Sequence, residues 1–196
     1  MEHIKAQLRI VAGSLRGRKL DCVVHEDLRP TPQMVREALF SILGNAVPER
    51  AFYDIFAGTG ANGLEAISRG ASEAIFLERD TRLAADIDKH LKKFAVTDKG
   101  RVLKTDVYRW ADRWIPPSQP INVFLSPPFA DLEERAEDFL TMVQTLMDKI
   151  PPDSTLTIQG ETGFPETKLP DAGAWDNRKY GRNMLFIWVK PLPGAE

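Results

Sequence analysis

The sequence contains little cysteine or histidine and no long apolar run, and each absence excludes a class of protein. Cys22 is the one cysteine, so no disulfide can form within the chain, as expected in a reducing compartment. The three histidines are scattered and show no Cys/His spacing typical of a zinc site, so we expect no metal. No stretch approaches the roughly 18 apolar residues of a membrane helix, and residues 1–20 lack the apolar segment of a signal peptide. We therefore expect a cytoplasmic protein without a membrane-spanning segment.

The chain also carries little net charge, which argues against indiscriminate binding to nucleic acid. The formal charge is −2, from 26 basic and 28 acidic residues. The average conceals an asymmetry, because residues 1–20 hold five basic residues against one acid, whereas residues 131–138 hold five acids against one arginine. Such polarity is consistent with one phosphate-facing end, and ordinary solvated surface is the alternative.

The first 46 residues are predicted to form a hairpin and a helix. Residues 8–12 and 18–23 are expected to be two strands, joined by a turn over residues 13–17. Thr31 is expected to cap the helix with Pro32 at its first position, and a glycine ends it at position 44. We divide the chain into an N-terminal annex, residues 1–46, and a second domain, residues 47–196. The apolar stripe of the helix consists of Val35, Leu39, Ile42 and Leu43.

From residue 51 onward, strand and helix patterns alternate. This alternation predicts an α/β fold, a mostly parallel sheet with helices on both faces. Ligands in such folds bind beyond the carboxyl ends of the strands, where the strand order reverses. We expect the last strand to pair antiparallel with a further strand near Trp175. Strands are predicted over residues 51–56, 74–77, 101–104, 121–125, 154–158 and 184–189, and helices over residues 62–69, 81–94 and 132–150.

A glycine-rich segment follows the first of these strands and opens a helix. Gly58, Gly60 and Gly63 fit the G-x-G-x-x-G pattern in its strand–turn–helix context. Glycines allow a sharp turn and a close approach of the backbone to a ligand. Glu78 ends the next strand, about 20 residues after the first glycine, where a carboxylate accepts hydrogen bonds from ribose hydroxyls. The pattern predicts an adenosine-bearing cofactor; a tight turn without a ligand is the alternative.

Two acids favour S-adenosylmethionine over a nicotinamide dinucleotide as that cofactor. Asp54 stands just before the glycines, at the end of its strand, where it repels a pyrophosphate but attracts the ammonium group of a methionine moiety. Asp106 follows the third strand and is a candidate acceptor for the adenine amino group. Because carboxylates at successive strand ends suit a cationic cofactor, we expect S-adenosylmethionine. A NAD(P)-dependent oxidoreductase is the alternative.

The tetrapeptide Ser126-Pro127-Pro128-Phe129 follows the buried strand at residues 121–125. Two prolines fix φ and remove two N–H donors, so the local carbonyls point outward as acceptors in a rigid loop. Ser126 Oγ and the Pro127 carbonyl are candidates to hydrogen-bond an exocyclic amine and leave its lone pair free for attack. Phe129 is a candidate to stack on the base, which must leave its own stack to reach the pocket. A plain chain reversal is the alternative.

Together these motifs make the chain resemble the RsmD-type 16S rRNA guanine-N2 methyltransferases over nearly its whole length. The matching stretches are residues 9–20 (RIVAGSLRGRKL), 29–43 (RPTPQMVREALFSIL), 54–71 (DIFAGTGANGLEAISRGA), 78–80 (ERD) and 123–129 (VFLSPPF). The resemblance implies a class I methyltransferase, Rossmann-like fold with an N-terminal β-hairpin and helix, and catalysis at residues 126–129. It also implies that the methyl donor is bound by Asp54, Phe56, Ala57, Gly58, Thr59, Gly60, Gly63, Glu78, Arg79 and Asp106.

One position departs from the family pattern, because the family has Asp or Asn where this chain has Ser126. Serine stands there in the similar cytosine-N4 amino-methyltransferases, and a neutral hydroxyl accepts more weakly than a carboxylate. We expect methyl transfer to persist, since the Pro-Pro-Phe segment and the donor loop are intact. Three alternatives stay open: methylation of another base or of DNA, a NAD(P)-dependent oxidoreductase, and an RNA-binding protein without catalysis.

The resemblance also implies contact with small-subunit ribosomal RNA or its ribonucleoprotein particle. The candidates are basic residues of the hairpin, of the following helix and of a cluster before the last strand. Each of them alone is more typical of solvated surface, and the sequence predicts no oligomeric state. RNA affinity is expected to fall steeply with salt. The candidate phosphate contacts are Arg9, Arg16, Arg18, Lys19, Arg29, Arg36, Arg178, Lys179 and Arg182.

Overall fold

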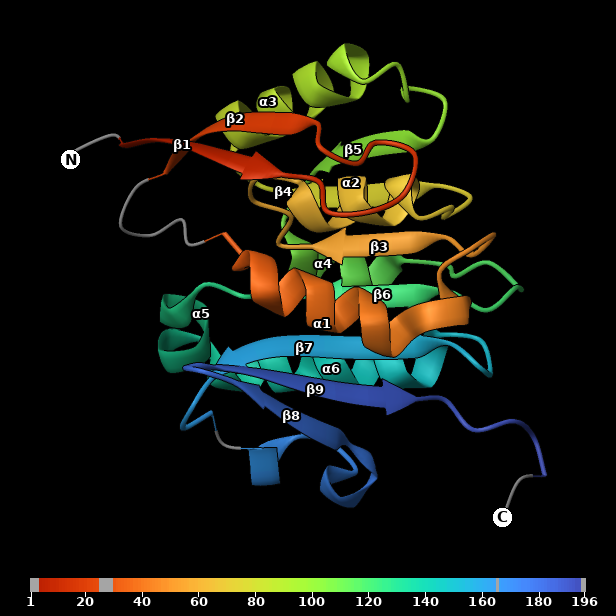
Figure 1. The fold of residues 1–196 in the computed structure, drawn as a ribbon. Helices are drawn as coiled ribbons and strands as arrows, with labels where there is room; N and C mark the ends of the chain where they lie inside the picture. The colour runs from red at the N-terminus through yellow and green to blue at the C-terminus, as the bar shows by residue number, and fades with distance from the viewer. Residues whose placement is uncertain (1–3, 25–29, 165, 195–196) are drawn as a thin grey trace.

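A central, mostly parallel sheet organises the chain, whose computed structural model describes residues 4–24, 30–164 and 166–194. Within these residues the strand order is β5-β4-β3-β6-β7-β9-β8 (Figure 1). The strands are β3 (Phe52–Ile55), β4 (Ala74–Glu78), β5 (Gly100–Lys104), β6 (Asn122–Leu125), β7 (Thr155–Glu161), β8 (Asp176–Tyr180) and β9 (Asn183–Val189). β3 to β7 are parallel, and β9 lies antiparallel to β7 and β8, as predicted for the last strands. The order reverses at β3, which lies between β4 and β6.

Helices cover both faces of this sheet, which confirms the α/β prediction (Figure 1). They are α1 (Gln33–Leu43), α2 (Ala61–Ser68), α3 (Thr81–Lys93), α4 (Val107–Arg113), α5 (Phe129–Glu134) and α6 (Ala136–Lys149). α4 and α6 share one buried cluster with Tyr53 and Ile55 of β3. On the opposite face, α1 shares a cluster with Phe52, and α2 and α3 share one with Phe76. None of these helices, within the described ranges, is long and apolar enough to cross a bilayer.

The N-terminal hairpin is confirmed, although its first strand begins and ends earlier than predicted, at residues 4 and 9 instead of 8 and 12. β1 (Ile4–Arg9) and β2 (Lys19–Val24) form a separate antiparallel sheet in which Arg9 lies opposite Lys19. The Ile10 N–H still donates across the hairpin to the Arg18 carbonyl (2.9 Å), but the N–H groups of residues 11 and 12 donate to Glu65 of α2, so the strand does not continue. Three apolar side chains from this segment are buried with α2 and α3: Ile10, Leu15 and Leu20.

Two helix predictions are wrong in detail. Thr31 does not cap α1: Pro32 is the N-cap, and Thr31 Oγ1 donates to Gln159 Oε1 of β7 at 2.7 Å. The helix expected over residues 132–150 is two helices, separated at Arg135, whose backbone (φ −126°, ψ 31°) leaves the helical region. α4 was not predicted, because its seven residues are too few for a clear helical period.

Candidate functional site

Three carboxylates lie at the carboxyl ends of three neighbouring strands, where the sequence predicted them. Asp54 is in β3, Glu78 ends β4, and Asp106 follows β5. These strands are adjacent and parallel, so their ends meet at one edge of the sheet. Because the strand order reverses at β3, this edge is where an α/β sheet opens a crevice for a ligand.

Asp54 holds the glycine loop from inside. Its side chain is 0% exposed, and Oδ2 accepts a hydrogen bond from the Gly63 N–H (2.9 Å). Oδ1 is also buried and has no hydrogen-bond partner among the described residues. Burial raises the pKa of Asp54 to about 8, so the carboxyl is mostly protonated at neutral pH. Once ionised, an unpaired buried carboxylate oxygen of this kind fits a cationic N–H donor supplied by a ligand.

The loop between Asp54 and α2 turns through left-handed backbone. Phe56, Gly58 and Gly60 have φ values of 63°, 54° and 74°. A Cβ at Gly63 would lie 2.2 Å from the Phe76 ring of β4. The last glycine therefore permits close packing of α2 on the sheet, whereas the sequence analysis assigned all three glycines to turning and ligand approach. Ala57 and Thr59, the other predicted loop residues, are both buried.

Glu78 holds the same loop from the neighbouring strand. Its Oε2 accepts from the Gly58 N–H (2.8 Å), and its Oε1 accepts from the Asp80 N–H (2.8 Å). Each oxygen of a carboxylate has a second lone-pair site, so Glu78 keeps acceptor capacity for ribose hydroxyls. Gly58 and Glu78, which the sequence predicted to act together, are thus hydrogen-bonded to each other. Arg79, also predicted to bind the donor, is exposed beside them.

Asp106 also has a structural role that was not predicted from the sequence. It is the N-cap of α4, and its Oδ1 accepts from the N–H groups of Tyr108 (3.0 Å) and Arg109 (3.1 Å). Its Oδ2 lies 3.8 Å from Arg135 Nη1. The cap fixes the carboxylate at the strand end, with Oδ2 still able to accept from a ligand.

The diproline corner, residues 126–128, lies beside this edge. The Ser126 N–H donates to the Ile55 carbonyl of β3 (3.3 Å), which places the corner next to the start of the glycine loop. Ser126 Oγ has no hydrogen-bond partner among the described residues. Pro128 is the N-cap of α5, and its carbonyl accepts from the next helical N–H groups. The side chain of Phe129, predicted to stack on a base, lies outside what the structure describes.

Tyr108, which the sequence analysis did not identify, connects the donor side of the site to α5. Its hydroxyl donates to Asp131 Oδ2 (2.8 Å), and the Arg135 guanidinium carbon lies 3.9 Å from its ring centroid. The Phe56 ring meets it edge-on, with centroids 6.0 Å apart. Burial, together with the bond to Asp131, raises the pKa of Tyr108 far above its usual range, so the hydroxyl remains a donor. The one sequence signal was an aromatic residue two positions after a strand-end acid.

Most basic residues predicted to contact RNA are exposed. Two groups, one in the hairpin and one around the β8–β9 turn, are separated along the chain. Arg178 is already paired with Asp176 (2.8 Å), and Arg18 lies over the Phe94 ring at 5.9 Å. The predicted contact Arg29 falls outside the described residues. The exposed members are Arg9, Arg16, Arg18, Lys19, Arg178, Lys179 and Arg182.

Arg36, also predicted to contact phosphates, is buried, unlike the other described basic candidates. Its side chain is 1% exposed, because α1 presents it to the hairpin rather than to solvent. Nη1 donates to the Thr31 carbonyl (3.0 Å) and Nη2 to the Arg9 carbonyl (2.8 Å). Helical periodicity did not distinguish this buried face from an exposed one.

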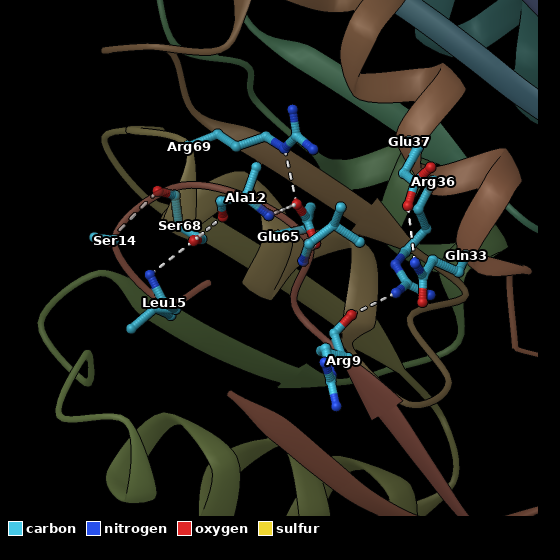
Figure 2. Close-up of polar contacts among 11 residues, drawn as sticks. Arg9, Ala12, Ser14, Leu15, Gln33, Arg36, Glu37, Glu65, Ser68 and Arg69 are labelled. Atoms are coloured by element: carbon cyan, nitrogen blue, oxygen red, sulfur yellow. Dashed lines mark hydrogen bonds and ion pairs between the residues drawn. The ribbon is translucent and has the colours of Figure 1, made fainter. Parts of the chain in front are cut away.

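Glu65 and Ser68 of α2 anchor the hairpin turn, and the sequence analysis missed both (Figure 2). Glu65 is 0% exposed and accepts from the N–H groups of Val11 (2.8 Å) and Ala12 (3.0 Å) and from Arg69 Nε (2.8 Å). Ser68 Oγ accepts from the residue-15 N–H (2.9 Å) and donates to the Ala12 carbonyl. Since α2 begins at the glycine loop, the hairpin is fixed to the helix that the loop opens. The available signal was a carboxylate inside a mostly apolar helix.

The polar groups that this site offers to a ligand are carboxylates, carbonyls and one hydroxyl. Among the described residues, no three His, Cys, Asp or Glu side chains gather closely enough to hold a metal ion. The carboxylates already accept backbone N–H groups, which is the arrangement of a loop prepared for an organic ligand with N–H and O–H donors.

Known proteins similar to this chain were found by sequence and by structure. The model of a family described as conserved hypothetical protein 95 matches residues 8–189. The Ribosomal RNA small subunit methyltransferase D of Haemophilus influenzae is 37% identical over 140 residues, covering 69% of this chain and 72% of that protein. A hypothetical protein from Thermus thermophilus, of known structure, is 27% identical with a TM-score of 0.72, covering 93% of this chain and 99% of that chain.

A fourth match concerns the fold alone. The Thermus thermophilus 16S rRNA N2 methyltransferase RsmC, solved with AdoMet and guanosine, has a TM-score of 0.72 at 21% identity. The match covers 97% of this chain and 51% of that chain. The fold of this chain is therefore one that methyltransferases also adopt.

Proposed function

Because this chain belongs to the RsmD-type family of small-subunit rRNA methyltransferases, we propose that it methylates the exocyclic N2 amine of a guanine in 16S rRNA. The methyl donor is S-adenosylmethionine. One observation carries the proposal: the donor-side carboxylates and the diproline corner share one edge of the sheet, joined by the bond from Ser126 to Ile55. Donor and acceptor groups at one edge satisfy the proximity that a direct transfer requires.

The residues of the donor side fit the proposed cofactor. When bound, S-adenosylmethionine supplies an electrophilic methyl group on a sulfonium. Asp54 Oδ1, buried and unpaired, accepts from the ammonium group, and Glu78 accepts from the ribose hydroxyls. Asp106 accepts from the adenine amino group with Oδ2, the oxygen that does not cap α4 and that lies 3.8 Å from Arg135 Nη1. The loop residues between them, including Phe56 and Gly58, form the wall of the donor site, with Arg79 at its rim.

The diproline corner orients the amine that is methylated. Ser126 Oγ and the Pro127 carbonyl accept hydrogen bonds from the N2 hydrogens, which favours a pyramidal nitrogen with its lone pair directed at the methyl carbon. Pro127 and Pro128 keep the corner rigid, so little reorganisation is needed at the moment of reaction. Phe129 stacks on the guanine ring. The base enters this pocket only after leaving its own stack, so an unpaired or extruded guanine is the substrate.

The annex, residues 1–46, engages the RNA, and residues 47–196 form the methyltransferase domain. The exposed basic side chains of the hairpin and of the β8–β9 turn approach phosphates. A ribosomal substrate, as RNA or as the assembling particle, places the enzyme in the cytoplasm.

Mass mapping of the modified nucleoside tests this function. The protein is incubated with labelled S-adenosylmethionine and unmodified small-subunit RNA or particles, and the methylated nucleoside is identified. We expect N2-methylguanosine at one position. Label in cytosine or in duplex DNA would refute the guanine assignment. Binding of NAD(P)H without binding of S-adenosylmethionine would indicate an oxidoreductase instead of a methyltransferase. Binding of RNA and of S-adenosylmethionine without methyl transfer would indicate a non-catalytic RNA-binding protein.

A further inference from the structure

Two cations lie directly opposite each other at the turn end of the hairpin. Arg9 of β1 and Lys19 of β2 are a cross-strand pair, so their side chains leave the same face of the two-stranded sheet. Both are exposed, and neither has an ion-pair partner among the described residues. Like charges in directly opposite positions destabilise a sheet. An anion bound between the two side chains would relieve this repulsion, which explains why the protein keeps two cations in these positions.

A groove of about 310 Å³ separates this face of the hairpin from the first turns of α1. Its lining combines three cations and two amides with a single apolar residue, and no carboxylate lines it. The groove also meets the N-terminal end of α1, where free backbone N–H groups favour negative charge. The lining residues are Gln7, Leu8, Arg9, Lys19, Gln33 and Arg36.

Arg36 gives the groove a buried positive charge. Both terminal nitrogens donate to backbone carbonyls, but Nε is buried and has no hydrogen-bond partner among the described residues. No carboxylate of the described chain lies within ion-pair distance of it; Glu65 pairs with Arg69 instead. A guanidinium does not lose its proton in a protein, so this charge persists although burial lowers its pKa. Arg36 therefore acts on the groove through its charge, as the groove's floor, and not through an exposed contact.

The acids nearest the groove are already occupied. Asp21 accepts from Gln7 Nε2 (2.8 Å) and pairs with Lys93 (3.0 Å). Glu37 accepts from Gln33 Nε2 (2.8 Å) on the exposed side of α1. Neither carboxylate lies between Arg9 and Lys19, so the groove retains its positive potential.

From these contacts we infer that the groove binds one backbone phosphate of the substrate RNA. The inference rests on the proposed function for the identity of the ligand. Arg9 and Lys19 hold the phosphate from the two strands, and Arg36 stabilises it from beneath. The groove is fixed to the glycine loop through α2, because the Arg36–Arg9 bond and the Glu65 anchor connect all three (Figure 2). Since phosphate contacts set register rather than sequence, this contact determines which nucleotide reaches the diproline corner.

The test compares the salt dependence of RNA binding between matched double variants. R9A/K19A removes the two exposed cations of the groove. R101A/K99A removes one arginine and one lysine at the amino-terminal end of β5, at the opposite edge of the sheet from the glycine loop. R9K/K19R retains both charges. Fluorescence anisotropy with a labelled, unmodified small-subunit RNA fragment gives the slope of log affinity against log salt, and calorimetry gives the donor Kd.

R9A/K19A is expected to reduce the magnitude of the slope by about 0.7 to 0.9, the value for one phosphate. R9K/K19R keeps the wild-type slope, and the donor Kd of R9A/K19A remains that of the wild type. If R9A/K19A and R101A/K99A give the same slope, the groove does not bind a phosphate and the inference is overturned.

The design separates failure of the groove from failure of the proposed function. The slope is measured without donor, so it does not depend on methyl transfer. A wild type that binds RNA but methylates no guanine refutes the function while the slope still tests the groove. If the wild type methylates guanine but R9A/K19A has the wild-type KM for RNA and the wild-type slope, the phosphate site in the groove is refuted and the proposed function is not.

Discussion

Binding of the methyl donor is expected to depend on pH through Asp54. The carboxyl is wholly buried, one oxygen lacks a partner, and burial raises its pKa to about 8. A cationic ammonium group pairs only with the ionised form, so a proton must leave before the pair forms. With a pKa of about 8, roughly 1% of the free protein is ionised at pH 6 and about half at pH 8. The donor affinity should therefore rise about 50-fold between these values, equivalent to about 2 kcal/mol.

Calorimetric titration of S-adenosylmethionine from pH 6 to pH 8 measures this dependence. Asp54→Asn keeps an oxygen for the Gly63 N–H but cannot ionise, so its donor affinity should be flat with pH and approach that of the wild type at pH 6. Asp148→Asn, which removes an exposed carboxylate on α6, is the matched control and should follow the wild-type curve. A wild-type affinity that does not change across this range would refute the pairing of Asp54 with the donor.

Three further predictions concern the acceptor side and the fold. Ser126→Asp should raise turnover on guanine about fivefold, since a charged acceptor gains about 1 kcal/mol over a hydroxyl; single-turnover kinetics check this, and inactivity of both forms would contradict catalysis at the corner. Tyr108→Phe leaves the buried Asp131 carboxylate without its 2.8 Å donor and should lower kcat while the donor Kd is unchanged; an equal loss in both would show that Tyr108 serves the donor site. Gly63→Ala should destabilise the fold by about 1–3 kcal/mol, because its Cβ meets the Phe76 ring at 2.2 Å; an unchanged melting temperature would contradict this.

The elements that the sequence predicted are those with a strong local pattern. The alternation of strands and helices, the glycine loop and the strand-end acids were all found where expected, because period, turn chemistry and chain order are local properties. Thr31 was misassigned because a β7 side chain competes for its hydroxyl. The break at Arg135 was missed because the apolar pattern of α5 and α6 continues across it.

The residues that sequence reasoning missed or misplaced depend on contacts between distant segments. Glu65 binds backbone groups 53 and 54 positions away, which no local window contains. Arg36 looked like a surface cation because the hairpin that buries it lies 27 residues earlier. For Glu65 the available clue was a carboxylate within the mostly apolar α2, but that clue does not identify the partner.

The contact between α2 and the hairpin turn constrains the sequence of the helix more than that of the turn. Glu65 and Ser68 recognise main-chain amides and a carbonyl, which every residue except proline presents in full. The side chains at positions 11 and 12 can therefore be substituted without loss of these hydrogen bonds, whereas those at positions 65 and 68 cannot. Gly13 is the exception in the turn, because a Cβ there would lie 1.7 Å from the Ser68 carbonyl oxygen. The hairpin turn can thus vary its surface while its attachment to α2 stays constant.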